Sequence, residues 1–257
     1  MSVYILVSAR MASSRCPGKA LAPLAGRPLL EVLLDRMDAV HGVDGVVLAT
    51  SVNAENDPLV EVARRAGFEV FRGDEDDVLR RHVDGARALG ADQIVRVTGD
   101  NPLTDVETIE LLVARHLRER ADYTYVPGDA LLMGILAEVI SHDALERSWE
   151  RGNARHRSEL MTLYIKEHPE EFKVVTVELP AGLYRPEYRL TVDEPEDVRL
   201  MQEIFGRLAA PGRRVTTREA ISLLDREPAL ARINAHLRHK AANLRSVALD
   251  AGIGKIV

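Results

Sequence analysis

Short apolar runs alternate with amphipathic stretches along the first 120 residues of the chain. Runs rich in valine, leucine and isoleucine predict strands at 3–9, 45–50, 68–72 and 92–98. Apolar positions repeated at helical spacing predict helices at 28–40, 57–66, 75–89 and 104–120. This alternation is typical of parallel strands joined by helices. The sequence therefore predicts an α/β fold, a mostly parallel sheet with helices on both faces.

The pattern changes after residue 121. Weaker strand and helix patterns predict a small mixed lobe at about 121–170, inserted before a last core strand at EYRLTV, 187–192. We therefore predict a main α/β domain at 1–208 and a C-terminal helical extension at 209–257. Thr104 with Glu107 and Thr216 with Glu219 have the spacing of capping boxes, which open helices.

Composition narrows the possible partners. The chain has 257 residues, is 46% apolar, carries a net charge of −6 and is only 4% aromatic, which disfavours nucleic acid as a partner. Its first apolar run is too short to span a membrane and lacks the flanks of a signal peptide, so we expect a soluble, cytoplasmic protein with no membrane partner. A single cysteine, Cys16, excludes an internal disulfide and a cysteine-rich zinc site.

The first strand runs directly into a cationic loop, ARMASSRCPGK at 9–19. Small residues with free backbone N–H groups, next to Arg10, Arg15 and Lys19, suit a triphosphate, which needs close backbone approach and positive charge. The alternative is an ordinary solvated basic loop. The loop has neither the GxxxxGK[ST] order of a P-loop nor the GxGxxG order of a dinucleotide-binding turn.

Two aspartates follow other predicted strands. Asp100 comes after the fourth strand in RVTGDNPLTD, and Asp193 comes after a later strand in RLTVDEPEDV. In open α/β sheets ligands bind beyond the carboxyl ends of strands, and Mg²⁺ takes one or two carboxylates together with phosphate oxygens. The two aspartates are thus candidate Mg²⁺ ligands. Alternatively, Asp100 is a turn residue before Asn-Pro and Asp193 a helix N-cap.

These motifs resemble those of the cytidylyltransferase family, which includes the CMP-Kdo and CMP-sialic acid synthetases. The resemblance covers about residues 3–208 and is strongest to the branch of spore-coat polysaccharide biosynthesis proteins of the SpsF type. It is carried by ARMASSRCPGK, by ATS at 49–51, by FRGDEDDVLRR at 71–81, and by the two aspartate motifs. LLDREPALARIN at 223–234 also resembles the tail of that branch.

The resemblance implies a nucleotide-diphospho-sugar transferase-like fold and a Mg²⁺-dependent enzyme that transfers CMP from CTP to a small anionic acceptor and releases pyrophosphate. It also implies a homodimer. Asp100 and Asp193 match the family's metal ligands, and Arg10, Arg15 and Lys19 its phosphate-binding and catalytic positions. The nucleotide-binding positions that it implies are Ala9, Arg10, Ser13, Ser14, Thr50, Ser51 and Thr98.

The acceptor is not identified by the resemblance. Leu136 and Leu160 stand where sugar-acid members have an acid and a histidine, which disfavours a Kdo-like or sialic acid-like substrate. Candidate contacts to an anionic acceptor are Arg72, Arg155 and Arg157, each of which could equally be a surface arginine. Two alternative functions stay open: a glycosyltransferase of similar build that uses a nucleotide-sugar, and a non-catalytic nucleotide-binding protein of a polysaccharide pathway.

Overall fold

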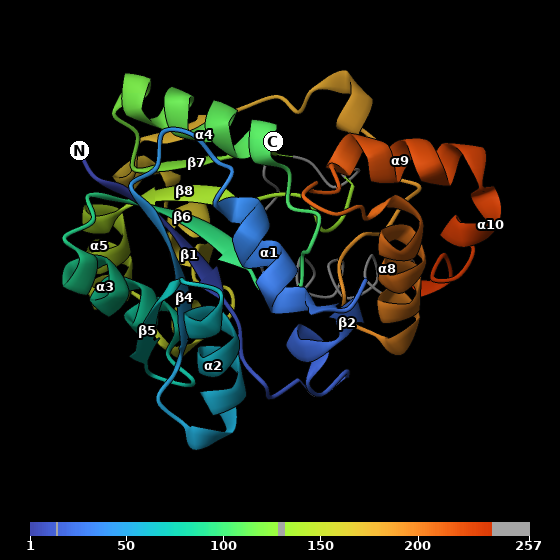
Figure 1. The fold of residues 1–257 in the computed structure, drawn as a ribbon. Helices are drawn as coiled ribbons and strands as arrows, with labels where there is room; N and C mark the ends of the chain where they lie inside the picture. Colours follow the sequence, from blue (N-terminus) through green and yellow to red (C-terminus); the bar gives the residue numbers. More distant parts are fainter. Residues whose placement is uncertain (14, 128–131, 238–257) are drawn as a thin grey trace.

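A seven-stranded sheet forms the centre of the structure (Figure 1). The computed structural model describes residues 1–13, 15–127 and 132–237, and within them the sheet has the order β5-β4-β1-β6-β8-β7-β9. β5, β4, β1 and β6 are parallel, whereas β8 is antiparallel to both β6 and β7. The strands are β1 (Val3–Ser8), β4 (Gly45–Ser51), β5 (Glu69–Gly73), β6 (Gln93–Thr98), β7 (Tyr123–Tyr125), β8 (Glu138–Ser141) and β9 (Val174–Thr176). A separate hairpin contains β2 (Pro23–Leu24) and β3 (Arg27–Pro28).

Helices cover both faces of this sheet, as the alternating pattern predicts. The described helices are α1 (Leu29–Met37), α2 (Asp57–Arg65), α3 (Val78–Leu89), α4 (Val106–Glu119), α5 (His142–Arg151), α6 (Ala154–Arg157), α7 (Leu163–Glu167), α8 (Pro195–Leu208), α9 (Thr217–Arg226) and α10 (Pro228–Ala231). Short 3-10 turns lie at η1 (Lys19–Leu21), η2 (Ala54–Asn56), η3 (Pro169–Glu171) and η4 (Ala181–Leu183).

The central strand β1 shows why these runs are apolar throughout. Ile5 and Val7 belong to a core that includes side chains of α1, α2 and α4, whereas Leu6 belongs to a core that includes α3, α5 and α7. Successive side chains of a strand point to opposite faces, so a strand covered on both sides must be apolar at every position. The predicted α/β class, a mostly parallel sheet with helices on both faces, is confirmed.

The stretch at about 121–170 contributes strands to the central sheet. β8 pairs with β6 through Arg96 and Glu138, and β7 pairs with β8. The prediction of a last core strand at 187–192 is wrong, since this sheet, as described, does not include those residues. Arg189 forms only an isolated bridge with Met133. The adjoining Leu190 and Val192 are buried in a separate core with α8 and α9 rather than against a neighbouring strand.

The last described helices pack together on one side of the molecule (Figure 1). Thr216 and Glu219 form the predicted capping box at the start of α9. The other predicted capping box is wrong, because Asp105 caps α4 by accepting from the backbone N–H of Thr108, while Thr104 donates its hydroxyl to the Asn101 carbonyl. Residues 238–257 of the predicted extension lie outside the described residues.

Candidate functional site

A cavity of about 730 Å³ opens where β1 and β6 end. Ser8 and Thr98, the last residues of these strands, are partners in the sheet, so the loops that follow them leave from the same edge. The Gly99 N–H donates to the Ser8 carbonyl at 2.8 Å. A side chain at Gly99 would place its Cβ 2.6 Å from the Ala9 Cβ, so glycine is needed for this close approach. The cationic loop and Asp100 therefore lie on the same cavity wall.

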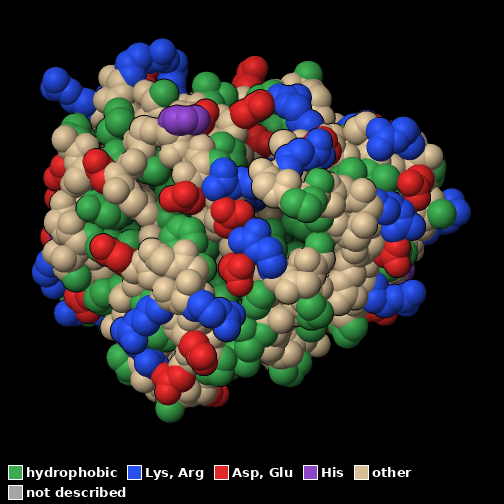
Figure 2. Space-filling model, in the orientation of Figure 1, with side chains coloured by type: hydrophobic (Ala, Val, Ile, Leu, Met, Phe, Trp, Pro, Cys, Tyr) green, Lys and Arg blue, Asp and Glu red, His purple; other side chains and the backbone are tan. Residues whose placement is uncertain are grey.

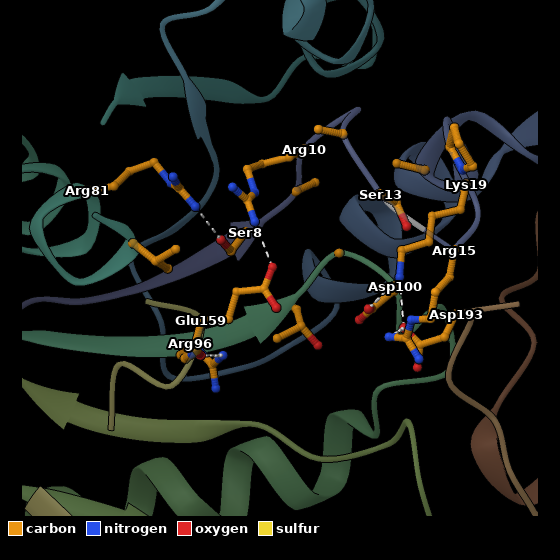
Figure 3. A pocket seen from close by; sticks show the side chains of 17 residues that line it. Ser8, Arg10, Ser13, Arg15, Lys19, Arg81, Arg96, Asp100, Glu159 and Asp193 are labelled. Atoms are coloured by element: carbon orange, nitrogen blue, oxygen red, sulfur yellow. Dashed lines mark hydrogen bonds and ion pairs between the residues drawn. The ribbon is translucent and has the colours of Figure 1, made fainter. Parts of the chain in front are cut away.

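At one end of the cavity Lys19 holds two carboxylates together. Its Nζ lies 2.8 Å from an Asp100 oxygen and 3.0 Å from an Asp193 oxygen, and it donates to the Val192 carbonyl at 2.7 Å. Arg15 donates to the same Asp193 oxygen at 3.0 Å. We call Arg15, Lys19, Asp100 and Asp193 the Lys19 cluster. The structure thus brings three distant stretches of sequence to one point, as Figure 3 shows.

The charges of the Lys19 cluster stabilise one another. Burial disfavours the Lys19 ammonium, but the Asp100 and Asp193 carboxylates outweigh this and raise the pKa of Lys19. Burial likewise disfavours the Asp193 carboxylate, but Lys19, Arg15 and Arg189 together lower the pKa of Asp193. Lys19 therefore stays an ammonium and Asp193 a carboxylate at neutral pH, the forms that phosphate and metal binding require.

The local backbone brings Lys19 to this point. Gly18 precedes η1 with φ 71°, in the left-handed region that favours glycine. The Gly18 N–H donates to the Met11 carbonyl at 3.2 Å, which closes the loop on itself. Lys19 is thus directed across the sheet edge towards Asp100 rather than into solvent.

The other end of the cavity carries three arginines, Arg10, Arg81 and Arg96, which we call the arginine end (Figure 3). Arg10 forms ion pairs with Glu75 at 3.1 Å and with Glu159 at 2.6 Å. The Glu159 side chain is 79% exposed, so solvent screening weakens the ion pair between Arg10 and Glu159.

Arg81 differs from its neighbours because no described carboxylate forms an ion pair with it. It is 1% exposed, donates to Ser8 Oγ at 3.2 Å, and has no partner for its Nε among the described residues. Burial, aided by the nearby charge of Arg10, lowers the pKa of Arg81 to about 10. Its Nη1 donates to the Asp74 and Glu75 carbonyls at 2.5 and 3.2 Å, so what Arg81 offers the cavity is a positive charge that no ion pair with a described residue neutralises.

Arg96 is anchored from beneath the cavity. Its guanidinium lies 2.7 Å from Glu138, which also lies 3.0 Å from Lys166 and accepts from the Tyr123 hydroxyl. Burial opposes ionisation of Glu138, but the charges of Lys166 and Arg96 outweigh it and lower the pKa of that carboxyl. The network therefore holds Arg96 in place while its Nε has no partner among the described residues.

Most of the predicted site residues line the cavity, but several do not. Those that line it are Ala9, Arg10, Ser13, Arg15, Lys19, Thr98, Asp100 and Asp193. Thr50 and Ser51 are fully buried in β4 and do not line it. Ser14 lies outside the described residues.

The three candidate acceptor contacts are engaged elsewhere. Arg72 donates to the Ser51 and Asn53 carbonyls and pairs with Asp57. Arg155 pairs with Glu167, and Arg157 lies over the Trp149 ring and donates to the Trp149 carbonyl. None of these three arginines lines the cavity.

The sequence reasoning missed Arg81, Arg96 and Glu159, which do line the cavity. Arg96 had a usable signal, because a charged residue inside the apolar run DQIVRVT needs a partner or a ligand. Arg81 also had one, because it is the last residue of the motif FRGDEDDVLRR at 71–81, whereas Glu159 lies on an ordinary polar segment and had none.

The chemistry of the Lys19 cluster fits a magnesium ion. Two carboxylates converge on one cationic group, and Mg²⁺ prefers one or two carboxylates with the rest of its shell from phosphate and water. Within the described residues no group of three or more His, Cys, Asp or Glu side chains is placed to hold a metal ion, so the protein's share here is two carboxylates at most. Asp100 and Asp193 are therefore the residues that would hold the ion.

Comparison with known proteins shows the family of the chain. The family model described as cytidylyltransferase matches residues 4–224. The chain belongs to the cytidylyltransferase family. The resemblance noted in the loop and aspartate motifs is thereby confirmed.

Relatives of this cytidylyltransferase match it over most of its length. Spore coat polysaccharide biosynthesis protein SpsF of Bacillus subtilis is 36% identical, over 88% of this chain and 95% of that protein. Uncharacterized protein MJ1063 of Methanocaldococcus jannaschii is 36% identical, over 94% of this chain and 98% of that protein. A solved cytidylyltransferase from Leptospira borgpetersenii superposes with a TM-score of 0.83 at 27% identity, covering 90% of this chain and 97% of that chain.

The surface of the cytidylyltransferase has mixed charge. On the face shown in Figure 2, Lys and Arg side chains are interspersed with Asp and Glu rather than gathered in a continuous basic band. Among the described helices, none is both long enough and apolar enough to cross a lipid bilayer.

Proposed function

We propose that this cytidylyltransferase transfers CMP from CTP to a small anionic acceptor in a Mg²⁺-dependent reaction and releases pyrophosphate. The observation that carries the proposal is the convergence of Arg15 and Lys19 with Asp100 and Asp193 at one end of the cavity. Cations and paired carboxylates in one place suit a metal-bound triphosphate, since phosphoryl and nucleotidyl transfer depend mainly on positioning and charge stabilisation.

In this proposal the Lys19 cluster binds the triphosphate. Asp100 and Asp193 hold Mg²⁺, which would neutralise charge on the phosphates when bound. Arg15 and Lys19 then donate to phosphate oxygens instead of to the carboxylates alone, and Arg10 donates from the start of the same loop. An ionised acceptor oxygen bonds to the α-phosphorus while the bond from the α-phosphorus to the bridging oxygen breaks, and pyrophosphate leaves with that electron pair.

The nucleoside part of CTP has its own proposed contacts. Ala9, Ser13 and Thr98 line the cavity and are proposed to contact the base and ribose, together with Ser14. Thr50 and Ser51 are buried behind the sheet edge, and we propose that they support the loop at the end of β4 rather than touch the nucleotide. The Ser51 hydroxyl accepts from the Asn53 N–H at 3.0 Å, which supports this role.

We place the anionic group of the acceptor at the arginine end. Arg81 and Arg96 line the cavity, whereas Arg72, Arg155 and Arg157 do not. Exposed Glu159 pairs with Arg10, and an incoming acceptor anion would displace it at small cost. The homodimer and the cytoplasmic location stay predictions from the family resemblance.

The main test measures pyrophosphate release with CTP and Mg²⁺ across phosphorylated, phosphonate and keto-acid sugar acceptors. We expect release with at least one acceptor and none in EDTA. Release of UDP from a UDP-sugar without pyrophosphate would establish the glycosyltransferase alternative instead. The absence of thermal stabilisation by CTP with Mg²⁺ would show that the protein does not bind this nucleotide.

A second experiment tests the acceptor end. Arg81→Met should raise the KM for the acceptor while the KM for CTP stays near that of the wild type. Arg87→Met is the matched control, because Arg87 lies on the same helix but is exposed and pairs with Asp84 and Glu146. Equal acceptor KM values in the two variants would remove Arg81 from the acceptor site.

A further inference from the structure

The carboxylate of Asp193 is held from two sides. Lys19 and Arg15 contact its Oδ1, whereas the Arg189 guanidinium donates to its Oδ2 at 2.9 Å. Arg189 is buried and does not line the cavity. Its contact with Asp193 therefore orients the carboxylate from the protein side and leaves the opposite side towards the cavity.

Arg189 is fixed in turn by Asp197. Its Nε donates to Asp197 Oδ1 at 2.9 Å and its Nη2 donates to Oδ2 at 3.0 Å, a two-point contact that sets the plane of the guanidinium. Asp197 is 0% exposed and lies in the first turn of α8. It also accepts from the backbone N–H groups of Asp193 and Glu194, so it holds the backbone at the aspartate as well as the arginine behind it.

A residue of the C-terminal segment completes this network. Asn234, in the turn that follows α10, is 1% exposed. Its Nδ2 donates to Asp197 Oδ1 at 2.8 Å and to the Arg189 carbonyl at 3.0 Å. Both partners are acceptors, so the position needs a neutral side chain that donates two hydrogen bonds, which an aspartate or an apolar residue of similar size cannot do.

Packing alone does not explain a polar residue here. The same segment is anchored to the body by Leu230, which is buried in the apolar core with α8 and α9. A second anchor at 234 could have been apolar, and a buried amide is tolerated only when its hydrogen bonds are made. The Asn234 amide instead donates to the groups that orient Asp193.

We propose that Asn234 is a positioning residue for the metal-binding carboxylate, acting through Asp197 and Arg189 on Asp193. The proposal rests on the proposed function, because it takes Asp193 as a metal ligand. It assigns a role to the motif LLDREPALARIN, of which Asn234 is the last residue. The C-terminal segment thereby becomes part of the catalytic apparatus without touching the substrate.

Replacement of Asn234 should weaken metal binding. Loss of the Asn234 donor leaves Asp197 with one hydrogen bond fewer on Oδ1, which loosens the two-point contact that fixes Arg189 behind Asp193. Residues that orient metal ligands typically change metal affinity by about 10- to 100-fold when replaced. The affinity for CTP without metal should change little, since Arg15 and Lys19 are unaltered.

The experiment uses full-length protein and Mn²⁺ as the probe. Mn²⁺ is titrated into wild type, Asn234→Ala and Asn234→Asp with CTP present, and free Mn²⁺ is counted by electron paramagnetic resonance against a CTP blank without protein. CTP binding in EDTA is measured by calorimetry. Leu230→Ala is the matched control, since it loosens the same segment without removing a hydrogen bond from Asp197. Melting temperatures confirm that each protein is folded at the temperature of the titration.

We expect Mn²⁺ to bind at least about 10-fold more weakly to both Asn234 variants, with metal-free CTP binding and the Leu230→Ala affinity near those of the wild type. If Asn234→Asp does not fold, the comparison of Mn²⁺ affinity between Asn234→Ala and Leu230→Ala decides whether Asn234 acts on the metal site. Wild-type Mn²⁺ affinity in Asn234→Ala, or an equal loss of Mn²⁺ affinity in Leu230→Ala, overturns the inference about Asn234 and leaves the proposed function standing. Failure of the wild type to bind Mn²⁺ with CTP overturns the metal assignment of the proposed function as well.

Discussion

Lys19 Nζ and Asp100 Oδ2 lie 2.8 Å apart although 81 positions separate them in the chain. The contact joins the loop after β1 to the loop after β6, and the parallel pairing of these two strands makes it possible. The same ammonium reaches Asp193, 174 positions away. The pair therefore marks the point at which the proposed triphosphate site is assembled.

Removing either member of this pair should abolish most of the activity. We expect Lys19→Ala and Asp100→Asn each to lower CTP turnover by about 100-fold or more, the effect of deleting one key electrostatic group. Pyrophosphate release is the measurement. Lys173→Ala is the control, because the Lys173 side chain is exposed and its ammonium donates to the Glu119 carbonyl, away from the cavity. Turnover like that of the control in both variants would refute the assignments.

The close approach at Gly99 predicts a steric effect on the site. In Gly99→Ala the new Cβ would lie 2.6 Å from the Ala9 Cβ and 2.8 Å from the Ser8 carbonyl oxygen. The end of β6 must then shift, which should lower the free energy of unfolding by about 1–3 kcal/mol and reduce turnover by displacing Asp100. Urea unfolding and pyrophosphate release measure the two effects.

Gly206→Ala is the matched control for that experiment. Gly206 lies in α8, and among the described residues no atom other than those of its chain neighbours and the adjacent helix backbone lies within 4 Å of the position that its Cβ would take. The substitution should raise the free energy of unfolding by about 0.5–1 kcal/mol, since alanine is favoured over glycine inside a helix. If Gly99→Ala were as stable and active as Gly206→Ala, the crowding at the sheet edge would be disproved.

Buried His82 predicts a loss of stability on acidification. Burial lowers the pKa of His82 to about 3, while its Nδ1 contacts the Val78 carbonyl at 2.8 Å. The unfolded chain, with a histidine pKa near 6.5, binds the proton more readily, so stability is complete above about pH 6.5 and falls as the pH drops towards 3. Between pH 7 and pH 5 this histidine should cost about 2 kcal/mol.

The variant His82→Gln isolates this contribution. Urea unfolding at the two pH values should show a smaller loss of stability in the variant than in the wild type, by about 2 kcal/mol. Identical pH dependence in His82→Gln and the wild type would mean that folding does not lower the pKa of His82.

Arg72 should matter for stability and not for turnover. Its guanidinium donates to the Ser51 and Asn53 carbonyls and to Asp57, and it does not line the cavity. Arg72→Met should therefore lower the free energy of unfolding by about 1–2 kcal/mol, since hydrogen bonds to the loop after β4 are lost. Steady-state rates measured well below the melting temperature should match the wild type. A raised acceptor KM would restore Arg72 as an acceptor contact.

Local patterns were sufficient for much of the architecture. The four parallel strands and their covering helices follow from runs such as VYILVS, because a strand buried on both faces must be apolar at every position. The segment at 187–192 has the same kind of pattern but is not a strand of the described sheet. Its apolar residues are buried against α8 and α9, and sequence alone does not tell which neighbour buries an apolar side chain.

By itself the sequence determined the fold class and the cationic loop, because both depend on residues close together in the chain. It also marked Asp100, since a polar residue that directly follows a buried strand must emerge at the strand end. Asp193 was marked by a strand prediction at 187–192 that the structure does not bear out. Only the tertiary structure decided that these carboxylates meet at Lys19, that Arg81 and Arg96 line the same cavity, and that Asn234 supports Asp193 through Asp197. Such contacts join side chains far apart in the sequence. Their distances depend on strand order and packing, which a local sequence pattern does not contain.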